Sequence, residues 1–212
     1  EIIPQSEIVQ LEVDETGSTF FENALLKARG VSEFTDHSVI ADDSGLIVPG
    51  LNNEPGLKSA RYASNDASDD ENKEKLKSEM RRLGFKEMPA YFVCVLVMIT
   101  SKDDPLPLYV EGRSNGTIKT KSIGDQGFGY DDMFYPDGYS ESFASINAST
   151  KLKLSHRGKA FAALKSDGTV VTWGDSSYGG DSSSVSSQLS GVSKIFSTYQ
   201  AFAALKEDGT VV

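Results

Sequence analysis

The pattern of hydrophobic and polar residues in the first three quarters of the chain predicts strands interleaved with helices. Runs of aliphatic and β-branched residues predict strands over Ile8–Val13, Val39–Asp43, Leu46–Val48, Tyr91–Thr100 and Leu108–Ile118. Strands that alternate with helical segments are typical of the α/β class. We therefore expect an α/β domain over residues 1–158.

Helical spacing is found in the segments between and after these strands. Thr19 and Glu22 have the spacing of a capping box, and the helix that follows has one apolar face, formed by Phe21, Ala24, Leu25, Ala28 and Val31. Asp66–Leu83 predicts a second, largely polar helix whose apolar positions are Leu76, Met80 and Leu83. A last helix is expected to begin near Ser149 and to run towards the C-terminal segment.

The C-terminal quarter contains an internal repeat. Ala160–Val171 returns 41 residues later as Ala201–Val212, with a single change. Each copy predicts a hairpin with an Asp-Gly turn, and Val192–Phe196 predicts a further strand. These phrases resemble the repeats of the regulator-of-chromosome-condensation propeller superfamily, although one and a third repeats cannot close a propeller. We expect a second domain over residues 159–212, formed by a partial all-β propeller-type repeat.

Composition narrows the classes of function. The 212 residues are 38% hydrophobic and 25% charged, as in a soluble globular protein, and the formal net charge is −10. This charge argues against a broad surface for nucleic acid or an anionic membrane, but it is compatible with a small basic pocket for a phosphorylated ligand. The longest apolar run is too short to span a bilayer, and it contains the single cysteine, Cys94, which we expect to be an inert core thiol. We see no signal peptide and expect a cytoplasmic protein.

The segment Val39–Leu46 is the most informative stretch for function. Asp42 and Asp43 end an apolar run, and Ser44 and Gly45 are expected to turn the chain. The two acids would then lie at the carboxyl end of a strand, where α/β folds keep their sites. Side chains alternate along a strand, so only one of the two acids is expected to enter a given pocket. A strand followed by an ordinary Asp-Gly-rich turn explains the same residues.

Further candidate residues are spread along the first 158 residues. Besides the acidic pair they are Glu15, Lys27, Arg61 of the Ser59–Tyr62 segment, the loop Gly127–Asp131, Lys151 and the segment Ser155–Gly158. Each also has a purely structural explanation. Glu15 can favour the dipole of the following helix, and Phe128 and Tyr130 can be core residues. A lone lysine is usually solvated, and His156 can cap a helix.

Taken together, these residues predict a site for a magnesium-bound polyphosphate. Glu15 and Asp43 supply the carboxylate oxygens that Mg²⁺ prefers, and Mg²⁺ commonly bridges such carboxylates to substrate phosphates. The charges of the phosphates would be neutralised by cations, and we expect these to be Lys27, Lys151 and Arg157. Phe128 or Tyr130, on a glycine-flanked loop, could stack on a flat base.

Five segments, taken in order, resemble a known enzyme family. They are Thr16–Ala24, Ala41–Leu46, Ser59–Tyr62, Gly127–Asp131 and Ser155–Gly158. Their order and spacing are similar to those of the noncanonical purine nucleoside triphosphate pyrophosphatases, the inosine/xanthosine triphosphatase family. The resemblance covers about residues 5–159. It implies a homodimeric α/β protein with a long twisted mixed sheet, flanking helices and two lobes. It also implies a hydrolase that sanitises the nucleotide pool by converting ITP, XTP and dITP to the monophosphate and pyrophosphate with Mg²⁺.

The resemblance also implies roles for individual residues. Glu15 and Asp43 match the family's acidic metal site, and Asp43 matches its catalytic proton acceptor. Ser44 matches a substrate contact beside them. The remaining substrate-binding candidates are Lys27, Arg61, Phe128, Gly129, Tyr130, Asp131, Lys151, His156 and Arg157.

The chain departs from the family pattern at both ends and in the loop. The family's first strand and its [Ser/Thr]-x-Asn-x-x-Lys motif do not precede Glu1, and the repeat follows where the family continues with a helix. Asp132 stands where the family has proline. These departures keep two alternatives open. One is a catalytically impaired binding module that recruits a partner through its propeller-type repeats. The other is a fragment or misjoined reading frame.

Overall fold

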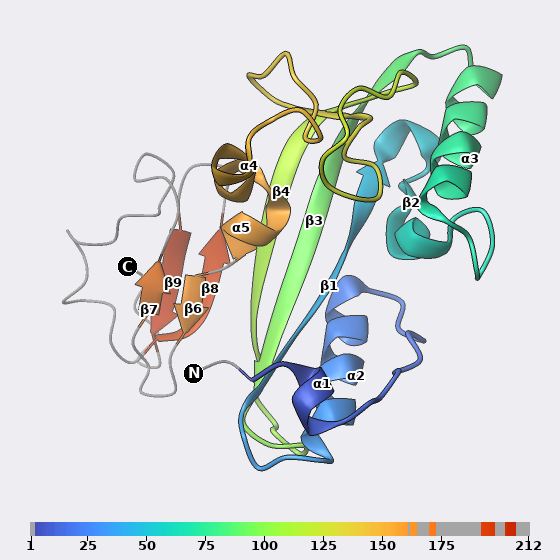
Figure 1. Cartoon of the computed structure of the whole chain (residues 1–212). Helices are drawn as coiled ribbons and strands as arrows, with labels where there is room; N and C mark the ends of the chain where they lie inside the picture. Colours follow the sequence, from blue (N-terminus) through green and yellow to red (C-terminus); the bar gives the residue numbers. More distant parts are fainter. Residues whose placement is uncertain (1–2, 161, 165–169, 173–191, 198–201, 207–212) are drawn as a thin grey trace. The chain divides into compact units, whose positions relative to one another are not determined.

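A computed structural model of the chain describes residues 3–160, 162–164, 170–172, 192–197 and 202–206. It contains a five-stranded antiparallel sheet with the strand order β2-β1-β3-β4-β5 (Figure 1). The strands are β1 (Val39–Val48), β2 (Glu54–Pro55), β3 (Glu87–Ile99), β4 (Leu108–Lys119) and β5 (Phe134–Pro136). The helices are α1 (Gln5–Ile8), α2 (Phe20–Ser32), α3 (Asp69–Arg82), α4 (Ala148–Leu154) and α5 (His156–Ala160), with 3₁₀ turns at Pro49–Leu51 and Gly56–Arg61.

The expected mixed sheet is therefore corrected to an antiparallel one. Strand β1 pairs antiparallel with β2, with Ile47 opposite Pro55, and β4 pairs antiparallel with β5, with Thr117 opposite Tyr135. The connection between β1 and β2 is short, and only antiparallel neighbours can be joined by such a turn, whereas parallel strands need a long crossover.

Strand β1 also differs from its prediction. The two short strands expected on either side of Ser44 and Gly45 are one continuous strand of ten residues, so the acidic pair lies in its middle and not at its end. The chain turns further on, after Val48, where Pro49 opens a 3₁₀ turn and Asn52 and Asn53 adopt φ angles of 56° and 66°. Proline followed by two asparagines is a stronger turn signal than Ser-Gly, because asparagine tolerates positive φ.

The strand predicted over Ile8–Val13 is wrong. The short helix α1 ends at Ile8, and residues 9–17 have no regular structure. The alternating apolar residues of this segment pack on a helix and do not form a strand of a sheet. A Cβ added to Gly30 of α2 would lie 2.8 Å from Val13 Cγ2 and 3.4 Å from Leu11 Cδ2, so both side chains cover α2 at this glycine.

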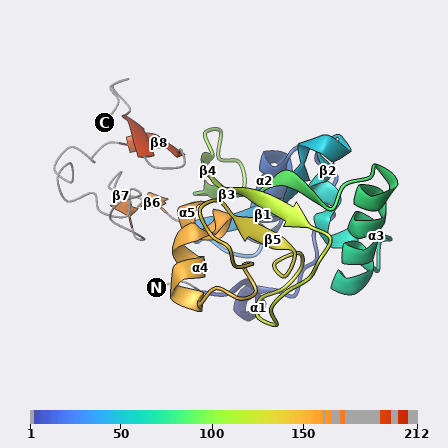
Figure 2. The same cartoon turned by 90° about the horizontal axis from the view of Figure 1, so that it is seen from above.

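The helix predictions are confirmed in their main features. Thr19 and Glu22 form the expected capping box at the start of α2, and Ala24, Ala28 and Val31 are buried. Helix α3 begins at Asp69, three residues later than expected, because Ser68 and Glu71 form a second capping box. Its Leu76 and Met80 are buried, whereas Leu83 caps the helix end and is 42% exposed. The last predicted helix is present as α4 and α5, which follow one another with Ser155 between them (Figure 2).

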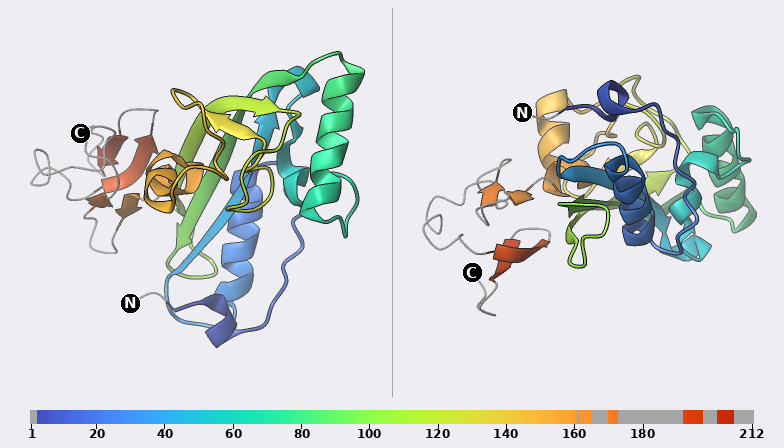
Figure 3. Two further views of the ribbon diagram at one scale, coloured as in Figure 1. Left: turned by 45° about the horizontal axis from the view of Figure 1, so that its top comes forward. Right: turned by 90° about the horizontal axis from the view of Figure 1, so that it is seen from below.

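The chain divides into two compact units. The first consists of Glu1–Asp43, Cys94–Glu111 and Ala160–Val212, and the second of Ser44–Val93 and Gly112–Lys159. In the first unit, α2 lies beside the first half of β1 (Figures 1 and 3). Cys94 is fully buried there, as expected. The second unit has its own apolar core, to which Leu46, Met80, Phe92, Ile118, Phe134 and Phe143 all contribute.

The C-terminal segment is described only in its strands. Strand β6 (Ala162–Leu164) pairs antiparallel with β7 (Val170–Thr172), which confirms the strands of the first predicted hairpin. Strand β8 (Val192–Ser197) pairs antiparallel with β9 (Phe202–Lys206). The Asp-Gly turns and the linking stretch 173–191 lie outside the described residues, and the boundary at residues 158/159 stays a prediction. Among the described residues, no helix is both long and apolar enough to cross a membrane.

Candidate functional site

The acidic residues predicted to bind metal meet in the first unit. Lys27 Nζ on α2 donates to Asp43 Oδ1 on β1 at 2.9 Å and to Glu15 Oε1 at 3.0 Å. Asn23, one helical turn before Lys27, donates from Nδ2 to Asp43 Oδ2 at 3.2 Å. Its Oδ1 accepts from the backbone N–H of Gly17 at 2.8 Å, which ties the segment before α2 to the same place. We call Glu15, Asn23, Lys27 and Asp43 the carboxylate cluster.

The two aspartates of β1 point to opposite faces, as alternation predicts. Asp43 is buried against α2, whereas Asp42 Oδ2 lies 3.7 Å from Cys94 Sγ of β3. One acid of the pair, Asp43, therefore joins the carboxylate cluster, and its role as a metal ligand stays a prediction.

Burial dominates the electrostatics of Asp43. It raises the pKa of this carboxyl above its usual value, although the hydrogen bond and charge of Lys27 act in the opposite direction. Burial acts to lower the pKa of Lys27, but the hydrogen bonds and charges of Asp43 and Glu15 outweigh it, so the pKa of Lys27 is raised. The cluster thus holds a firmly protonated lysine beside a carboxylate with increased proton affinity.

The donor set of the carboxylate cluster fits a magnesium-type ion bound together with substrate. Within the described part of the chain, no three or more His, Cys, Asp or Glu side chains form a complete metal cage. However, Glu15 and Asp43 both lie within 3.0 Å of the Lys27 ammonium, so the two carboxylates are close enough together to share a bound cation. Mg²⁺ is typically held by one or two carboxylates, with waters and substrate phosphates completing its shell.

The second unit contains the glycine-rich loop, residues Gly127–Asp132, which we call the nucleotide loop after the role predicted for it from the sequence. Gly127 and Gly129 adopt φ angles of 85° and 58°. A Cβ at Gly127 would lie 2.3 Å from Asp131 Oδ2 and 2.6 Å from Lys151 Nζ, so the close approach of these groups requires glycine. Asp131 Oδ2 accepts from the backbone N–H of Phe128 at 2.9 Å and from Lys151 Nζ at 2.6 Å.

The tip of the nucleotide loop presents an aromatic ring next to cations. The Phe128 side chain is 66% exposed. Lys151 Nζ lies 5.7 Å from its ring centroid, and the guanidinium carbon of Arg157 lies 5.6 Å from it. Arg157 also donates to Ser44 Oγ at 2.7 Å. An exposed ring flanked by two cations can stack on a base and attract an anion at the same time.

His156, the residue before Arg157, is buried and neutral. Its ring stacks on Phe92 with centroids 4.8 Å apart, and its Nδ1 has no hydrogen-bond partner among the described residues. Burial, together with the charges of Arg157, Lys151 and Lys159, lowers the pKa of His156 to about 3. A buried polar atom left without a partner costs free energy, so a ligand group that reached it would remove that cost.

Two sequence candidates occupy other positions. Tyr130 is buried in the core, and its hydroxyl donates to Ser59 O at 2.9 Å, so Phe128 is the ring of this pair that is exposed. Arg61 is half-buried at the end of the second 3₁₀ turn. Asn23 was not among the site residues predicted from the sequence, although its position four residues before Lys27 puts both on one face of α2.

Two features of this α/β protein are typical of a protein that binds nucleotides. One is the pair of carboxylates that share a cation, and the other is the exposed ring flanked by cations. The model of the Ham1 family matches residues 2–167, and the chain belongs to this family. It is 42% identical over 163 residues to a protein named dITP/XTP pyrophosphatase from Legionella pneumophila (strain Paris), covering 77% of this chain and 84% of that protein. It is 45% identical over 164 residues to the protein of that name from Vibrio parahaemolyticus, with 77% and 82% covered.

Solved structures agree with this assignment. A HAM1 protein from Coxiella burnetii superposes with a TM-score of 0.72 at 38% identity, over 76% of this chain and 81% of that one. The Ham1 protein of Staphylococcus aureus superposes with a TM-score of 0.68 at 39% identity, over 76% and 82%. The resemblance of the α/β part to this family is thereby confirmed. No comparison supports the propeller resemblance of the C-terminal segment.

Proposed function

We propose that the chain is an enzyme that hydrolyses noncanonical purine nucleoside triphosphates, such as dITP, XTP and ITP, to the monophosphate and pyrophosphate. The observation that carries this proposal is the carboxylate cluster, in which Lys27 joins buried Asp43 to half-buried Glu15. It occurs in a chain whose relatives at 42% and 45% identity are named dITP/XTP pyrophosphatase.

In this proposal Glu15 and Asp43 bind the metal and activate water. Bound Mg²⁺ supplies Lewis-acid chemistry to the substrate phosphates. Asp43 orients the attacking water and accepts its proton at a carboxylate oxygen. Lys27, which the cluster keeps protonated, offsets negative charge on the phosphate oxygens.

The second unit is proposed to bind the base and the remaining charge. Phe128 stacks on the purine, with Gly129 and Asp131 shaping the loop around it. Lys151, Arg157 and Ser44 bind polar groups of the substrate, and Arg61 and Tyr130 support the same segments. These assignments rest on the exposure of Phe128 and on the cations beside its ring.

Neutral His156 offers a basis for base selection. Its unpartnered Nδ1 can carry the ring proton and donate to the oxygen at position 6 of hypoxanthine or xanthine. Adenine has an amino donor at that position and would leave the donor unpaired, a mismatch that polar sites reject strongly. Guanine also has an oxygen there, so its rejection does not follow from this contact.

The family resemblance also supports a homodimer and a cytoplasmic location as proposals. The repeated C-terminal segment supports a second candidate function, in which propeller-type hairpins add a protein-binding module. The antiparallel pair β6–β7 is the observation in its favour. If the repeats only recruit a partner, a chain that ends at Ala160, the last residue of α5, will keep the full hydrolytic rate.

The first experiment measures the products released from dITP, XTP, ITP and dATP, with and without Mg²⁺. We expect pyrophosphate, not orthophosphate, released from the first three nucleotides only when Mg²⁺ is present. The Asp43→Asn variant measures the background of the preparation. Equal release from dATP, or release from wild type that does not exceed the variant's, would contradict the proposal.

A further inference from the structure

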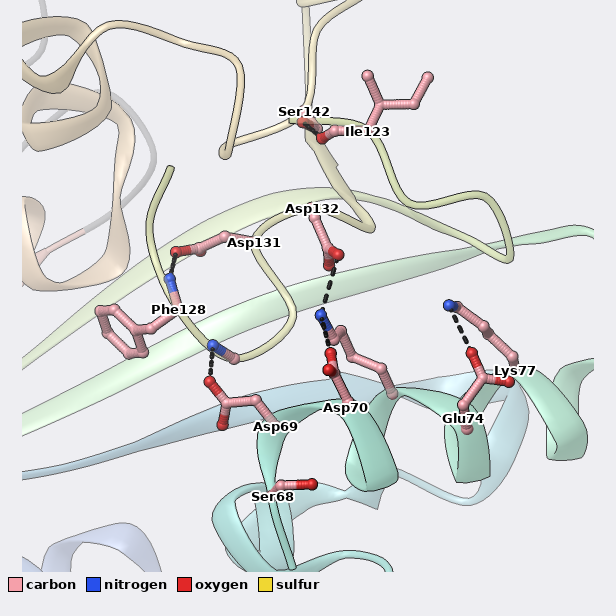
Figure 4. Close-up of polar contacts among 12 residues, drawn as sticks. Ser68, Asp69, Asp70, Glu74, Lys77, Ile123, Phe128, Asp131, Asp132 and Ser142 are labelled. Atoms are coloured by element: carbon pink, nitrogen blue, oxygen red, sulfur yellow. Dashed lines mark hydrogen bonds and ion pairs between the residues drawn. The ribbon is translucent and has the colours of Figure 1, made fainter. Parts of the chain in front are cut away.

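The nucleotide loop is held from two sides by lysines on different helices. Its consecutive acids face opposite ways, and Asp131 pairs with Lys151 of α4 at 2.6 Å. Asp132 Oδ2 pairs with Lys73 Nζ of α3 at 3.0 Å. Asp69, at the start of α3, accepts from the backbone N–H of Gly129 at 2.6 Å. Figure 4 shows Asp69 and Asp70 of α3 directed towards the loop that carries Phe128, Asp131 and Asp132.

The contact between Lys73 and Asp132 is more than a surface ion pair. Both side chains are only 16% exposed. Asp132 Oδ1 is buried and has no hydrogen-bond partner among the described residues, so the carboxylate depends on Lys73 for compensation of its charge. Lys73 in turn lies 2.8 Å from Asp70 within α3, which keeps it directed along this edge of the helix.

The tip of the loop needs such external support. Gly127 and Gly129 flank Phe128, and glycine restricts the backbone least. A loop that is ordered before binding does not pay the entropy of ordering when the ligand arrives. The hydrogen bond from Gly129 to Asp69 and the ion pair of the neighbouring Asp132 are therefore contacts with α3 that restrain the loop on both sides of Tyr130 and Asp131, close to Phe128.

We propose that Lys73 and Asp69 of α3 are positioning residues that pre-order the nucleotide loop, so that Phe128 is placed to stack on the base of the substrate. This inference rests on the proposed nucleotide hydrolysis. It assigns to α3 a part in substrate affinity, although α3 itself supplies no group to the reaction.

The kinetic test compares Lys73→Met with Lys77→Met. Lys77 is the matched control because it lies one turn further along α3 and pairs with Glu74 of the same helix at 2.8 Å. We expect Lys73→Met to raise KM for dITP about threefold to tenfold while kcat changes less than about twofold. Lys73→Arg is expected to restore the wild-type KM, and Lys77→Met to leave it unchanged. An unchanged KM in a folded Lys73→Met variant, or an equal effect in the control, overturns the proposal.

A second measurement does not need hydrolysis. Amide hydrogen exchange of the nucleotide-free protein is followed over Gly127–Asp132. We expect exchange to be faster in Lys73→Met than in wild type, and the same as wild type in Lys77→Met. Adding Asp132→Asn to Lys73→Met should not make exchange any faster, because the ion pair is already broken. Unaltered exchange in Lys73→Met overturns the positioning role. If wild type hydrolyses no nucleotide but this pattern is found, the proposed function fails and the role of α3 in ordering the loop remains.

Discussion

Burial shifts the pKa of an acid in the carboxylate cluster and the pKa of a base, His156, in the second unit. In the carboxylate cluster it raises the pKa of Asp43, and in the second unit it lowers the pKa of His156 to about 3. Both shifts favour the neutral form, as loss of solvent always does. The neighbours differ, because Asp43 has a lysine within 2.9 Å, whereas the charges that act on His156 are all cationic. The lysine thus opposes the effect of burial on Asp43, whereas the cations around His156 add to that effect and keep the ring uncharged.

The largest expected effect comes from removing the acid of the carboxylate cluster. Asp43→Asn should lower kcat for dITP at least about a hundredfold, because the variant can no longer accept a proton from water. Its free energy of unfolding should change by less than about 1 kcal/mol, because two effects of the substitution oppose each other. The variant no longer buries a charge, which is stabilising, but its new amide N–H₂ faces a donor of Lys27 or Asn23, which is destabilising. Steady-state kinetics and chemical denaturation measure the two quantities.

The control for this prediction is the adjacent acid. Asp42→Asn removes the same charge on the opposite face of β1 and should keep kcat within about tenfold of wild type. If both variants lost activity equally, the alternation of the strand would not separate the roles of the two acids.

The second prediction concerns the exposed ring. Phe128→Ala should raise KM for dITP about tenfold, because stacking of a base on an aromatic side chain contributes roughly 1–3 kcal/mol. Because the carboxylate cluster is untouched, kcat should be nearly unchanged. Tyr139→Ala is the matched control, since Tyr139 is another exposed aromatic residue of the second unit. A fall in kcat without a change in KM would assign Phe128 a different role.

The third prediction concerns the pH dependence of stability, to which His156 and Asp43 contribute with opposite signs. The pKa of His156 is about 3 when folded and near its ordinary 6.5 when unfolded, so between these values the unfolded state binds the extra proton. Its contribution to stability is complete above pH 6.5 and is lost as the pH falls towards 3, by at most about 1.4 kcal/mol per pH unit. The raised pKa of Asp43 has the opposite sign, because it favours the folded state at low pH.

Denaturation of His156→Phe at several pH values between 7 and 4 measures this contribution. The variant keeps an aromatic ring on Phe92 but cannot be protonated, so its stability should fall less steeply with acid than that of wild type. His37→Phe is the control at an exposed position. Parallel stability curves for His156→Phe and wild type would show that His156 is not kept neutral by the fold.

The smallest expected effects come from the two capping boxes. Thr19→Ala at α2 and Ser68→Ala at α3 should each lower the free energy of unfolding by about 1 kcal/mol. Their kinetic consequences should differ. The first turn of α2 carries Asn23 of the carboxylate cluster, so Thr19→Ala should lower kcat, about twofold. The first turn of α3 carries Asp69, so Ser68→Ala should raise KM instead. The same kinetic change in both variants would contradict this division.

The sequence predicted best where a residue's structure depends on near neighbours. Both helix starts have local signals, and the capping box at Thr19 is confirmed in detail. The opposite directions of Asp42 and Asp43 follow from strand geometry alone. The predictions that failed depended on partners remote in sequence. Ile8–Val13 has the alternation of a strand, but its apolar side chains cover Gly30 of α2, and the chain passes straight through Ser44 and Gly45 because its turn residues come later.

The sequence by itself determined which chemical groups are present. They are the five segments that match the family in their order, the acidic pair, the glycine-flanked Phe128 and the cations after residue 150. Only the tertiary structure decided which of these groups meet. Lys27 joins Glu15 to Asp43, and Lys73 joins α3 to Asp132 of the nucleotide loop, across 59 residues of chain. The reason is physical. A cap or an alternation is set by bonds within a few residues, whereas an ion pair between distant segments requires packing of the whole chain.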